Sequence, residues 1–240
     1  MTTDDLPTAW ALVVAGGRGK RMGTETPKQL LLLDGVTILE RSLRPFIDCS
    51  AVAGIVISAN EAVIDRCRAV AREISSTAKD TIVVAGGVER QDSVWNGLQA
   101  LPDAAEIVAV HDAVRPFITR ELVCDGIRAA ALHGAVSVMR RLKETVKVVE
   151  DGVVRSTPDR EKLRITQTPQ TFRTELLKRA HISARKDGIV GTDDCMLVER
   201  LGHPVRIIEG DDLNIKITTQ ADLGIAEAIL PLFEQRGKIC

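Results

Sequence analysis

The sequence predicts an α/β fold, a doubly wound, mainly parallel sheet from which a β-hairpin arm projects. Three observations predict it. Apolar strand-like runs alternate with amphipathic helical segments over the first 133 residues. A glycine-rich basic loop follows the first apolar run, and an Asp-Gly turn between extended segments interrupts the alternation after about residue 136. Ligands of such sheets bind beyond the carboxyl ends of the strands, so we expect the functional residues there.

The composition fits a single domain over residues 1–240, with a β-arm insertion at about 140–160. Hydrophobic residues make up 45% of the chain but aromatic residues only 2%, so the core must be aliphatic. A net charge of −1, without a basic stripe interleaved with aromatic residues, argues against a nucleic-acid partner. The apolar runs are too short to span a membrane, and residues 1–7 lack an apolar targeting segment. We therefore expect a cytoplasmic protein.

The five cysteines are odd in number and widely spaced. No CxxC pair and no Cys/His spacing is typical of a zinc site. Reduced thiols are the expectation in a cytoplasmic chain.

The first apolar run and the loop after it predict a polyphosphate site. Residues 11–15 (ALVVA) are typical of a strand buried on both faces. The loop has glycines at positions 16, 17, 19 and 23, and it carries Arg18, Lys20, Arg21 and Lys28. Glycine lets backbone N–H groups approach a phosphate, and the cations neutralise its oxygens. A flexible basic surface turn is the alternative.

The spacing of this loop excludes two common phosphate-binding motifs. A P-loop requires Ser or Thr after Gly-Lys, but Arg21 follows Lys20. The dinucleotide fingerprint requires a third glycine where Met22 stands. The remaining pattern, GGxGxRM followed five residues later by PKQ, resembles the loop of nucleotidyltransferases that activate sugar and polyol phosphates.

The alternation of elements can be followed along the chain. Thr37 and Glu40 predict a capping box for a helix that ends at about residue 48. The expected strands that follow cover residues 52–58, 81–85 and 106–111. One helix is expected with Val63, Cys67, Val70 and Ile74 along one face. Two more are expected over about 93–100 and 120–133.

Beyond residue 136 the pattern changes. Extended segments at 136–139, 145–149 and 153–154 flank the turn Asp151-Gly152, and they predict the arm. TQTPQTF (166–172) leads into a helix over about 173–186, and Thr192, Asp193 and Asp194 begin another. We expect late strands at 205–208 and 214–218. Thr219 caps a last helix with Leu223, Ala226, Ile229, Leu230 and Phe233 on one side.

Several motifs fall at the ends of the expected strands. Gly86, Gly87, Arg90 and Ser93 follow one strand, where they could meet a base or a phosphate. Asp112 follows the next strand in HDAVRP, and Mg²⁺ typically takes one or two carboxylates plus phosphate oxygens. A turn or cap residue is the alternative for this aspartate. NIKIT (214–218) places a lysine within an expected apolar strand, which is unusual. A solvated lysine at the edge of the sheet is the common explanation for such a residue.

Taken in order, these motifs resemble the 2-C-methyl-D-erythritol 4-phosphate cytidylyltransferase family over essentially the whole chain. The matching pieces are AGGRGKRM, PKQ, AGGxERQDSV, HDAVRPFI, a degenerate xDR, QTPQTF, GTDDxxLVE, EGDxLNIKITT and the final helix. The resemblance implies a nucleotide-binding sheet like that of nucleotide-diphospho-sugar transferases. It also implies a homodimer whose arms clasp, and the hairpin near 144–155 fits such an arm. The implied reaction transfers CMP from CTP to 2-C-methyl-D-erythritol 4-phosphate, releasing pyrophosphate.

The resemblance assigns roles one residue at a time. Arg21 and Lys28 are expected to stabilise charge on the transferring phosphoryl group, and Asp112 is expected to hold Mg²⁺. Arg160 is expected to reach the substrate phosphate of the partner subunit, and Lys216 helps hold the same site. The nucleotide is expected to contact Ala15, Gly16, Gly17, Gly86, Ser93 and Ala113, and the polyol phosphate Thr145, Arg160, Thr192 and Lys216.

The chain departs from the family pattern at a few positions. Val88 stands where aspartate is frequent, which puts one nucleotide contact in doubt, and Lys143-Glu144-Thr145 stands where VxDTIK is usual. The expected partners are CTP and a polyol phosphate. Two alternatives stay open, namely a ribitol-5-phosphate cytidylyltransferase and a non-catalytic nucleotide-binding protein on the same fold.

Overall fold

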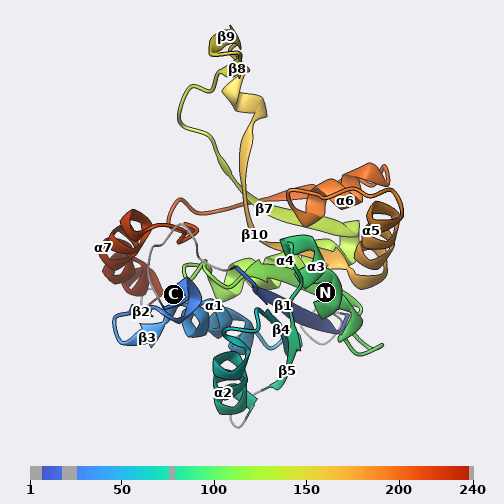
Figure 1. The fold of residues 1–240 in the computed structure, drawn as a ribbon, viewed down its shortest axis with the longest axis vertical. Helices are drawn as coiled ribbons and strands as arrows, with labels where there is room; N and C mark the ends of the chain where they lie inside the picture. Colours follow the sequence, from blue (N-terminus) through green and yellow to red (C-terminus); the bar gives the residue numbers. More distant parts are fainter. Residues whose placement is uncertain (1–6, 18–25, 76–78, 238–240) are drawn as a thin grey trace.

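A seven-stranded sheet forms the centre of the computed structural model, which describes residues 7–17, 26–75 and 79–237 (Figure 1). The strand order is β11-β7-β10-β6-β1-β4-β5. Pairs β1–β4, β1–β6, β4–β5 and β7–β11 are parallel, whereas β10 runs antiparallel to both neighbours. The strands are β1 (Ala9–Ala15), β4 (Val52–Ala59), β5 (Asp80–Ala85), β6 (Ile107–Asp112), β7 (Ala135–Arg141), β10 (Arg164–Arg173) and β11 (Arg206–Glu209).

Helices cover both faces of the sheet, which confirms the doubly wound, mainly parallel prediction. Alternate residues of β1 face opposite sides, with Val13 in one core cluster and Leu12 in the other. On the Val13 side lie α1 (Ile38–Ile47), α2 (Ile64–Ser75) and α4 (Arg120–His133). On the Leu12 side lie α3 (Arg90–Gln99), α5 (Thr174–Lys186) and α6 (Asp194–Arg200).

A third, smaller core lies under the last helix, α7 (Gln220–Gly237). Its Ala226 and Leu230 pack with Phe117 and Ile217, and the apolar side predicted for this helix is confirmed. A short hairpin of β2 (Leu32–Leu33) and β3 (Val36–Thr37), which was not predicted, completes this region. Within the described part of the chain, no helix is long and apolar enough to cross a membrane.

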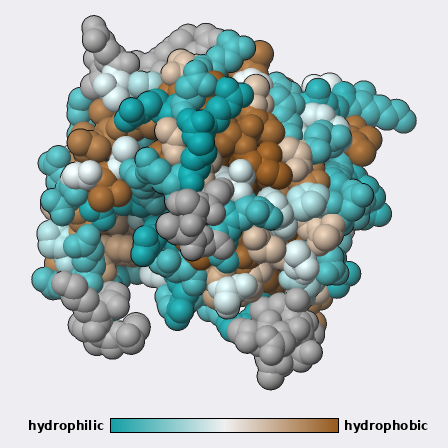
Figure 2. Space-filling view, turned by 90° about the horizontal axis from the view of Figure 1, so that it is seen from below, coloured by the Kyte–Doolittle hydropathy of each residue, from teal (hydrophilic) through white to brown (hydrophobic). Residues whose placement is uncertain are grey.

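A local sequence signal correctly predicted the start of α1. The Thr37 hydroxyl accepts from the Glu40 N–H at 3.1 Å, and the Thr37 N–H donates to the Glu40 carboxylate at 3.0 Å. This is the predicted capping box of α1. Hydrophilic residues spread over much of the face turned away from the arm (Figure 2), as expected for helices whose outer sides meet water.

The arm leaves the sheet between β7 and β10 (Figure 1). At its tip, β8 (Val148–Glu150) and β9 (Val153–Ser156) form an antiparallel ribbon. Asp151 and Gly152 have φ values of 51° and 76°, the left-handed conformations that a tight hairpin turn requires. The predicted hairpin is confirmed, although its first strand begins at residue 148 rather than 145.

Two late elements differ from the prediction. Residues 214–218 do not form a strand. Instead the Asn214 amide donates to the Thr168 carbonyl at 3.0 Å and the Ile217 N–H to the Val114 carbonyl at 2.9 Å, so the segment is held by single bonds rather than a ladder. Conversely, TQTPQTF lies within β10, a strand that was not predicted. The side chains of Gln167, Thr168 and Gln170 within it are buried and hydrogen-bonded, which a hydropathy pattern does not reveal.

Candidate active site

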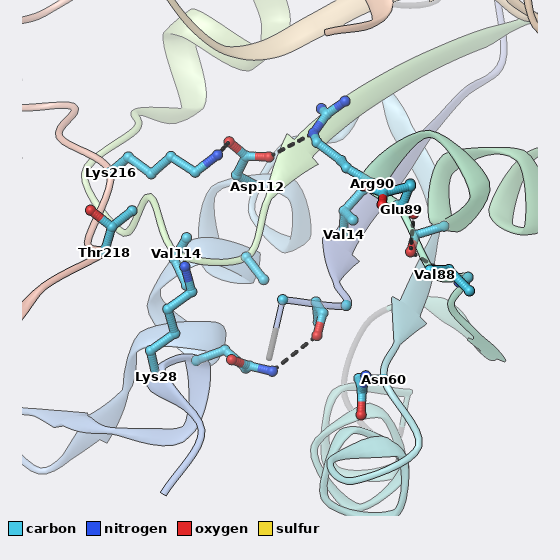
Figure 3. Close-up of a pocket in the computed structure, with 17 residues that line it drawn as sticks. Val14, Lys28, Asn60, Val88, Glu89, Arg90, Asp112, Val114, Lys216 and Thr218 are labelled. Carbon is cyan, nitrogen blue, oxygen red and sulfur yellow. Dashed lines mark hydrogen bonds and ion pairs between the residues drawn. The ribbon is translucent and has the colours of Figure 1, made fainter. Parts of the chain in front are cut away.

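A cavity of about 530 Å³ opens beyond the carboxyl ends of β1 and β6 (Figure 3). This is where the sheet topology places ligands. The lining comes from segments far apart in the sequence: Val14, Ala15, Gly16, Gly17, Lys28, Gln29, Asn60, Gly87, Val88, Glu89, Arg90, Ser93, Asp112, Ala113, Val114, Lys216 and Thr218. Eight of the predicted site residues are therefore gathered in one cavity: Ala15, Gly16, Gly17, Lys28, Ser93, Asp112, Ala113 and Lys216.

The glycines that follow β1 and β5 both lie against the hydroxyl of Ser93. A Cβ atom on either Gly16 or Gly86 would lie 2.9 Å from the Ser93 Oγ, closer than real side chains allow. The same oxygen accepts from the Gly87 N–H at 3.0 Å and donates to the Glu89 carbonyl at 3.2 Å. Ser93 thus joins both glycine turns to the start of α3, and only glycine permits this close approach.

The lysine of the PKQ motif enters the cavity from the 3-10 turn η2 (Lys28–Leu30). The neighbouring Gln29 is 1% exposed, and its amide donates to the Ala15 carbonyl at 2.9 Å. This bond ties the turn to the end of β1 and so positions Lys28 (Figure 3). Arg21, the other cation predicted for this loop, lies outside the described residues.

Three cations surround the Asp112 carboxylate at the end of β6. Its Oδ1 accepts from Arg90 Nε at 3.2 Å, and its Oδ2 lies 2.8 Å from Lys216 Nζ and 3.6 Å from Arg115 Nε (Figure 3). Burial by itself would raise the pKa of Asp112, but Arg90, Lys216 and Arg115 together hold this pKa well below its usual range. The carboxylate is therefore ionised at neutral pH.

The backbone of Asp112 is fixed from behind. Its N–H donates to Thr168 Oγ1 at 3.1 Å, and this hydroxyl bonds to His111 Nδ1 at 2.9 Å. His111 Nε2 lies 3.1 Å from the Arg115 carbonyl. Burial lowers the pKa of His111 to about 4, so the ring is neutral and donates from Nε2 to the carbonyl while Nδ1 accepts. His111 is a structural link and does not face the cavity.

Arg90 lines the cavity at the strand end where the sequence suggested a base or phosphate contact, but its guanidinium is also engaged by two acids. Its guanidinium bridges Asp112 and Asp194, with Nη1 2.7 Å from Asp194 Oδ2. Sequence reasoning missed this pairing because 104 residues separate its two ends. It also gave no role to Gln29 or Arg115, although both stand in motifs that were singled out.

The remaining predicted residues do not line this cavity within one chain. Gly86 packs behind Ser93, and Thr192 is exposed, with its hydroxyl 3.8 Å from Met196 Sδ. Thr145 and Arg160 are exposed on the arm side of the molecule. Arg160 donates to the Lys143 carbonyl at 3.0 Å and lines a second, shallower hollow of about 310 Å³, formed by Arg141, Leu142, Lys143, Arg160, Glu161 and Arg164.

The fold and this cavity define an α/β protein of the nucleotide-binding class, with cations and one carboxylate gathered beside glycine turns at the strand ends. A sequence profile of the IspD family, described as 2-C-methyl-D-erythritol 4-phosphate cytidylyltransferase, matches residues 9–231. The chain belongs to this family.

Relatives and solved structures agree with that assignment. A 2-C-methyl-D-erythritol 4-phosphate cytidylyltransferase from Geobacter metallireducens is 46% identical over 226 residues, covering 92% of this chain and 97% of the relative. Another, from Symbiobacterium thermophilum, is 44% identical over 95% of this chain and 94% of its own. The crystal structure of 4-diphosphocytidyl-2C-methyl-D-erythritol synthase from Anaerococcus prevotii has a TM-score of 0.83 at 29% identity, covering 94% of this chain and 99% of that one.

Proposed function

We propose that this chain transfers CMP from CTP to 2-C-methyl-D-erythritol 4-phosphate, forming 4-diphosphocytidyl-2-C-methyl-D-erythritol and pyrophosphate in isoprenoid precursor synthesis. The observation that carries the proposal is the meeting of Lys28, Lys216 and Asp112 in one cavity, within a chain that belongs to the family of this enzyme. A cytoplasmic location is part of the proposal, and the four described cysteines, all free, suit a reducing compartment.

The residues of the cavity suit this chemistry. An oxygen of the substrate phosphate attacks the α-phosphorus of CTP, the bond to the β-phosphate oxygen breaks, and pyrophosphate leaves. The attacking oxygen is already anionic, so the reaction needs no general base. The reaction requires that two polyanions be held together and that the developing charge be neutralised. Cations that are already in position before the substrates bind can provide both. Lys28 and Lys216 serve this role, together with Arg21.

Mg²⁺ is the proposed cofactor, with Asp112 as its ligand from the protein. Among the described residues, no group of three or more His, Cys, Asp or Glu side chains could hold a metal ion by itself. A buried, ionised carboxylate facing a polyphosphate cavity fits an ion that takes its other ligands from phosphates and water. Bound there, Mg²⁺ would neutralise phosphate oxygens of CTP.

The functional unit of the proposal is a homodimer, because the arm is an incomplete surface. An isolated two-stranded ribbon is marginal in water, and this one exposes Val148, Val149, Val153 and Val154. A twofold interface would let each arm cover the other. Thr145 and Arg160 would then serve the substrate phosphate of the partner's site. The basic hollow around Arg160 supports this, because a guanidinium can grip phosphate through two hydrogen bonds.

The direct test measures pyrophosphate release from CTP and Mg²⁺ with each of two acceptors. We expect turnover with 2-C-methyl-D-erythritol 4-phosphate and much less with ribitol 5-phosphate. The reverse preference would assign the chain to the ribitol phosphate reaction. An enzyme that binds CTP but releases no pyrophosphate with either acceptor would be a nucleotide-binding protein only.

A further inference from the structure

A line of charged and polar side chains leads from the cavity into the interior of the protein. Lys216 and Arg90 both contact Asp112, Arg90 also contacts Asp194, and Asp194 in turn contacts His181. The members come from five elements: the segment before α7, β6, α3, α5 and α6. Asp194 and His181 lie behind the cavity and do not line it.

Asp194 is the fixed point of this line. It is 1% exposed, and its two oxygens are both engaged, Oδ2 by Arg90 Nη1 at 2.7 Å and Oδ1 by His181 Nε2 at 3.2 Å. The Asp194 N–H donates to Gln170 Oε1 at 3.1 Å, which attaches the start of α6 to β10. The same glutamine donates to Asp193 Oδ2 at 2.8 Å. The carboxylate therefore has little freedom to move.

His181 supports Asp194 from the far side. Its ring is fully buried and lies stacked against Trp95, with 6.1 Å between ring centroids and 23° between planes. The Arg185 guanidinium lies over the Trp95 ring, 5.5 Å from its centroid. The imidazole N–H that faces Asp194 is thus held by packing between α3 and α5.

The Arg90 guanidinium links the buried Asp194 to Asp112 at the cavity. Its planar fork uses separate nitrogens for the two acids, Nη1 for Asp194 and Nε for Asp112 Oδ1. With Oδ1 occupied, the other oxygen of Asp112 is directed to Lys216 at the cavity. Burial would lower the pKa of Arg90, but the two carboxylates raise it, so the bridge stays charged.

We propose that Asp194, supported by His181, is a positioning residue for the transfer reaction, holding the Arg90 guanidinium that orients the Asp112 carboxylate. Without Asp194, Arg90 loses its inner anchor and becomes free to turn toward the phosphates of CTP, and Asp112 loses its fixed orientation. Misplacement of a reacting group by about 1 Å is enough to cost on the order of a hundredfold in rate. The inference rests on the proposed function.

The rival role for Arg90 is direct binding of a CTP phosphate. The two roles differ in which kinetic constant they affect. A positioning role lowers kcat when the bridge is broken and leaves KM for CTP nearly unchanged, because the ground-state contacts of CTP remain. A phosphate-binding role raises KM and weakens CTP binding when Arg90 is changed, and it leaves kcat insensitive to Asp194.

The experiment compares Asp194→Asn, Arg90→Lys, Arg90→Met and the double variant Asp194→Asn/Arg90→Met by steady-state pyrophosphate release, so that both single changes of the double variant are measured. Calorimetric titration with CTP and thermal unfolding accompany each measurement. Asp194→Asn keeps the shape of the side chain but loses the charge, and Arg90→Lys keeps the charge but loses the fork. Asp187→Asn is the matched control, because Asp187 pairs with Arg200 at 3.1 Å on the outer side of the same two helices.

We expect kcat to fall roughly 10- to 100-fold in Asp194→Asn and in Arg90→Lys, with KM and the calorimetric Kd for CTP within about twofold of wild type. The double variant should lose no more than the larger single loss, because both changes break one bridge. Asp187→Asn should keep the wild-type kcat. If Asp194→Asn does not fold, the Arg90 variants and the double variant still test the bridge, since the double change removes both charges together.

Three results would overturn the proposal: wild-type kcat in Asp194→Asn, a rise in the Kd for CTP that accounts for the lost activity, or losses that multiply in the double variant. Failure of the proposed function is distinguishable from all three, because the wild-type protein itself would then release no pyrophosphate.

Discussion

The Asp112 cluster and the arm represent opposite ways of making a charged site. Around Asp112, charges that face the cavity are paired, buried and bonded to the backbone, so the site is organised before any ligand arrives. On the arm, Arg160 and its basic neighbours lie on the surface near a ribbon whose four valines are left exposed by the described part of the chain. The cluster obtains its geometry from one chain, whereas in the proposed dimer the arm would acquire a comparable environment against the partner chain.

The largest effect is expected at the cavity itself. Lys28→Ala removes a cation that lines the cavity from a short turn, so chemistry should suffer far more than packing. We expect kcat to fall on the order of a hundred- to a thousandfold, as when a single oxyanion-stabilising donor is removed. Thermal unfolding should stay near the wild-type temperature, and Arg21→Ala should behave alike. A near-wild-type rate in either variant would remove that residue from the transition state.

Next in size is the change that breaks the centre of the cluster. Asp112→Asn keeps the shape but leaves Arg90, Arg115 and Lys216 without their shared anion. We expect a loss of activity on the order of a hundredfold that excess Mg²⁺ only partly restores, and a destabilisation of about 3 kcal/mol from the uncompensated buried charge. Full activity of the wild-type enzyme in a chelator would exclude the metal role.

The third prediction concerns the pH dependence of stability, which should come from buried groups of the Asp112 cluster and not from the exposed arm. The folded protein holds the pKa of His111 at about 4 against an ordinary 6.5, so the unfolded chain takes up the proton first as pH falls. Stability should therefore be complete above pH 6.5 and decline by about 3 kcal/mol as pH falls toward 4. The pKa values of Asp112 and Asp194 are lowered below their usual range, so their effects come at still lower pH. Denaturant unfolding should show this slope, and His111→Gln should flatten it.

The smallest change to be measured is the partial recovery of activity that tests the arm. Arg160→Ala and Lys28→Ala should each be nearly inactive as homodimers. Refolded together, they should recover roughly a quarter of wild-type activity, because random pairing leaves one site with both residues intact in half of the dimers. No recovery, with subunit exchange verified by differently tagged chains, would mean that Arg160 acts within its own chain.

Sequence reasoning succeeded where the signal was local. The buried run before the glycine loop, the Thr37–Glu40 box and the Asp151-Gly152 turn each depend on residues a few positions apart, and all three are confirmed. Sequence reasoning failed where an element is determined by contacts with residues far away in the chain. β10 is a strand because β6 and β7 pair with it on either side, and its buried polar side chains disguise it.

The same distinction applies to the candidate site. Asp112, Lys28 and Lys216 could be found from motifs at strand ends, and the structure brings them together. The bridge from Arg90 to Asp194 could not, because Arg90 and Asp194 look like an ordinary helix start and an ordinary first-turn acid until the sheet is assembled. Thr145, Thr192 and Arg160 stay predictions, since their roles depend on substrate or partner.

The course of β10 has a consequence for how this chain tolerates changes in length. The strand begins at the base of the arm, and along it Thr168 supports the backbone of Asp112 and Gln170 anchors Asp194. Residues added or removed at the hairpin tip would change only the reach of the arm. One residue lost from β10 would turn the side chains beyond it to the opposite face of the sheet, so Gln170 would point away from α6. A change in the length of the arm would therefore leave the site intact, whereas a change in the length of the strand that carries it would not.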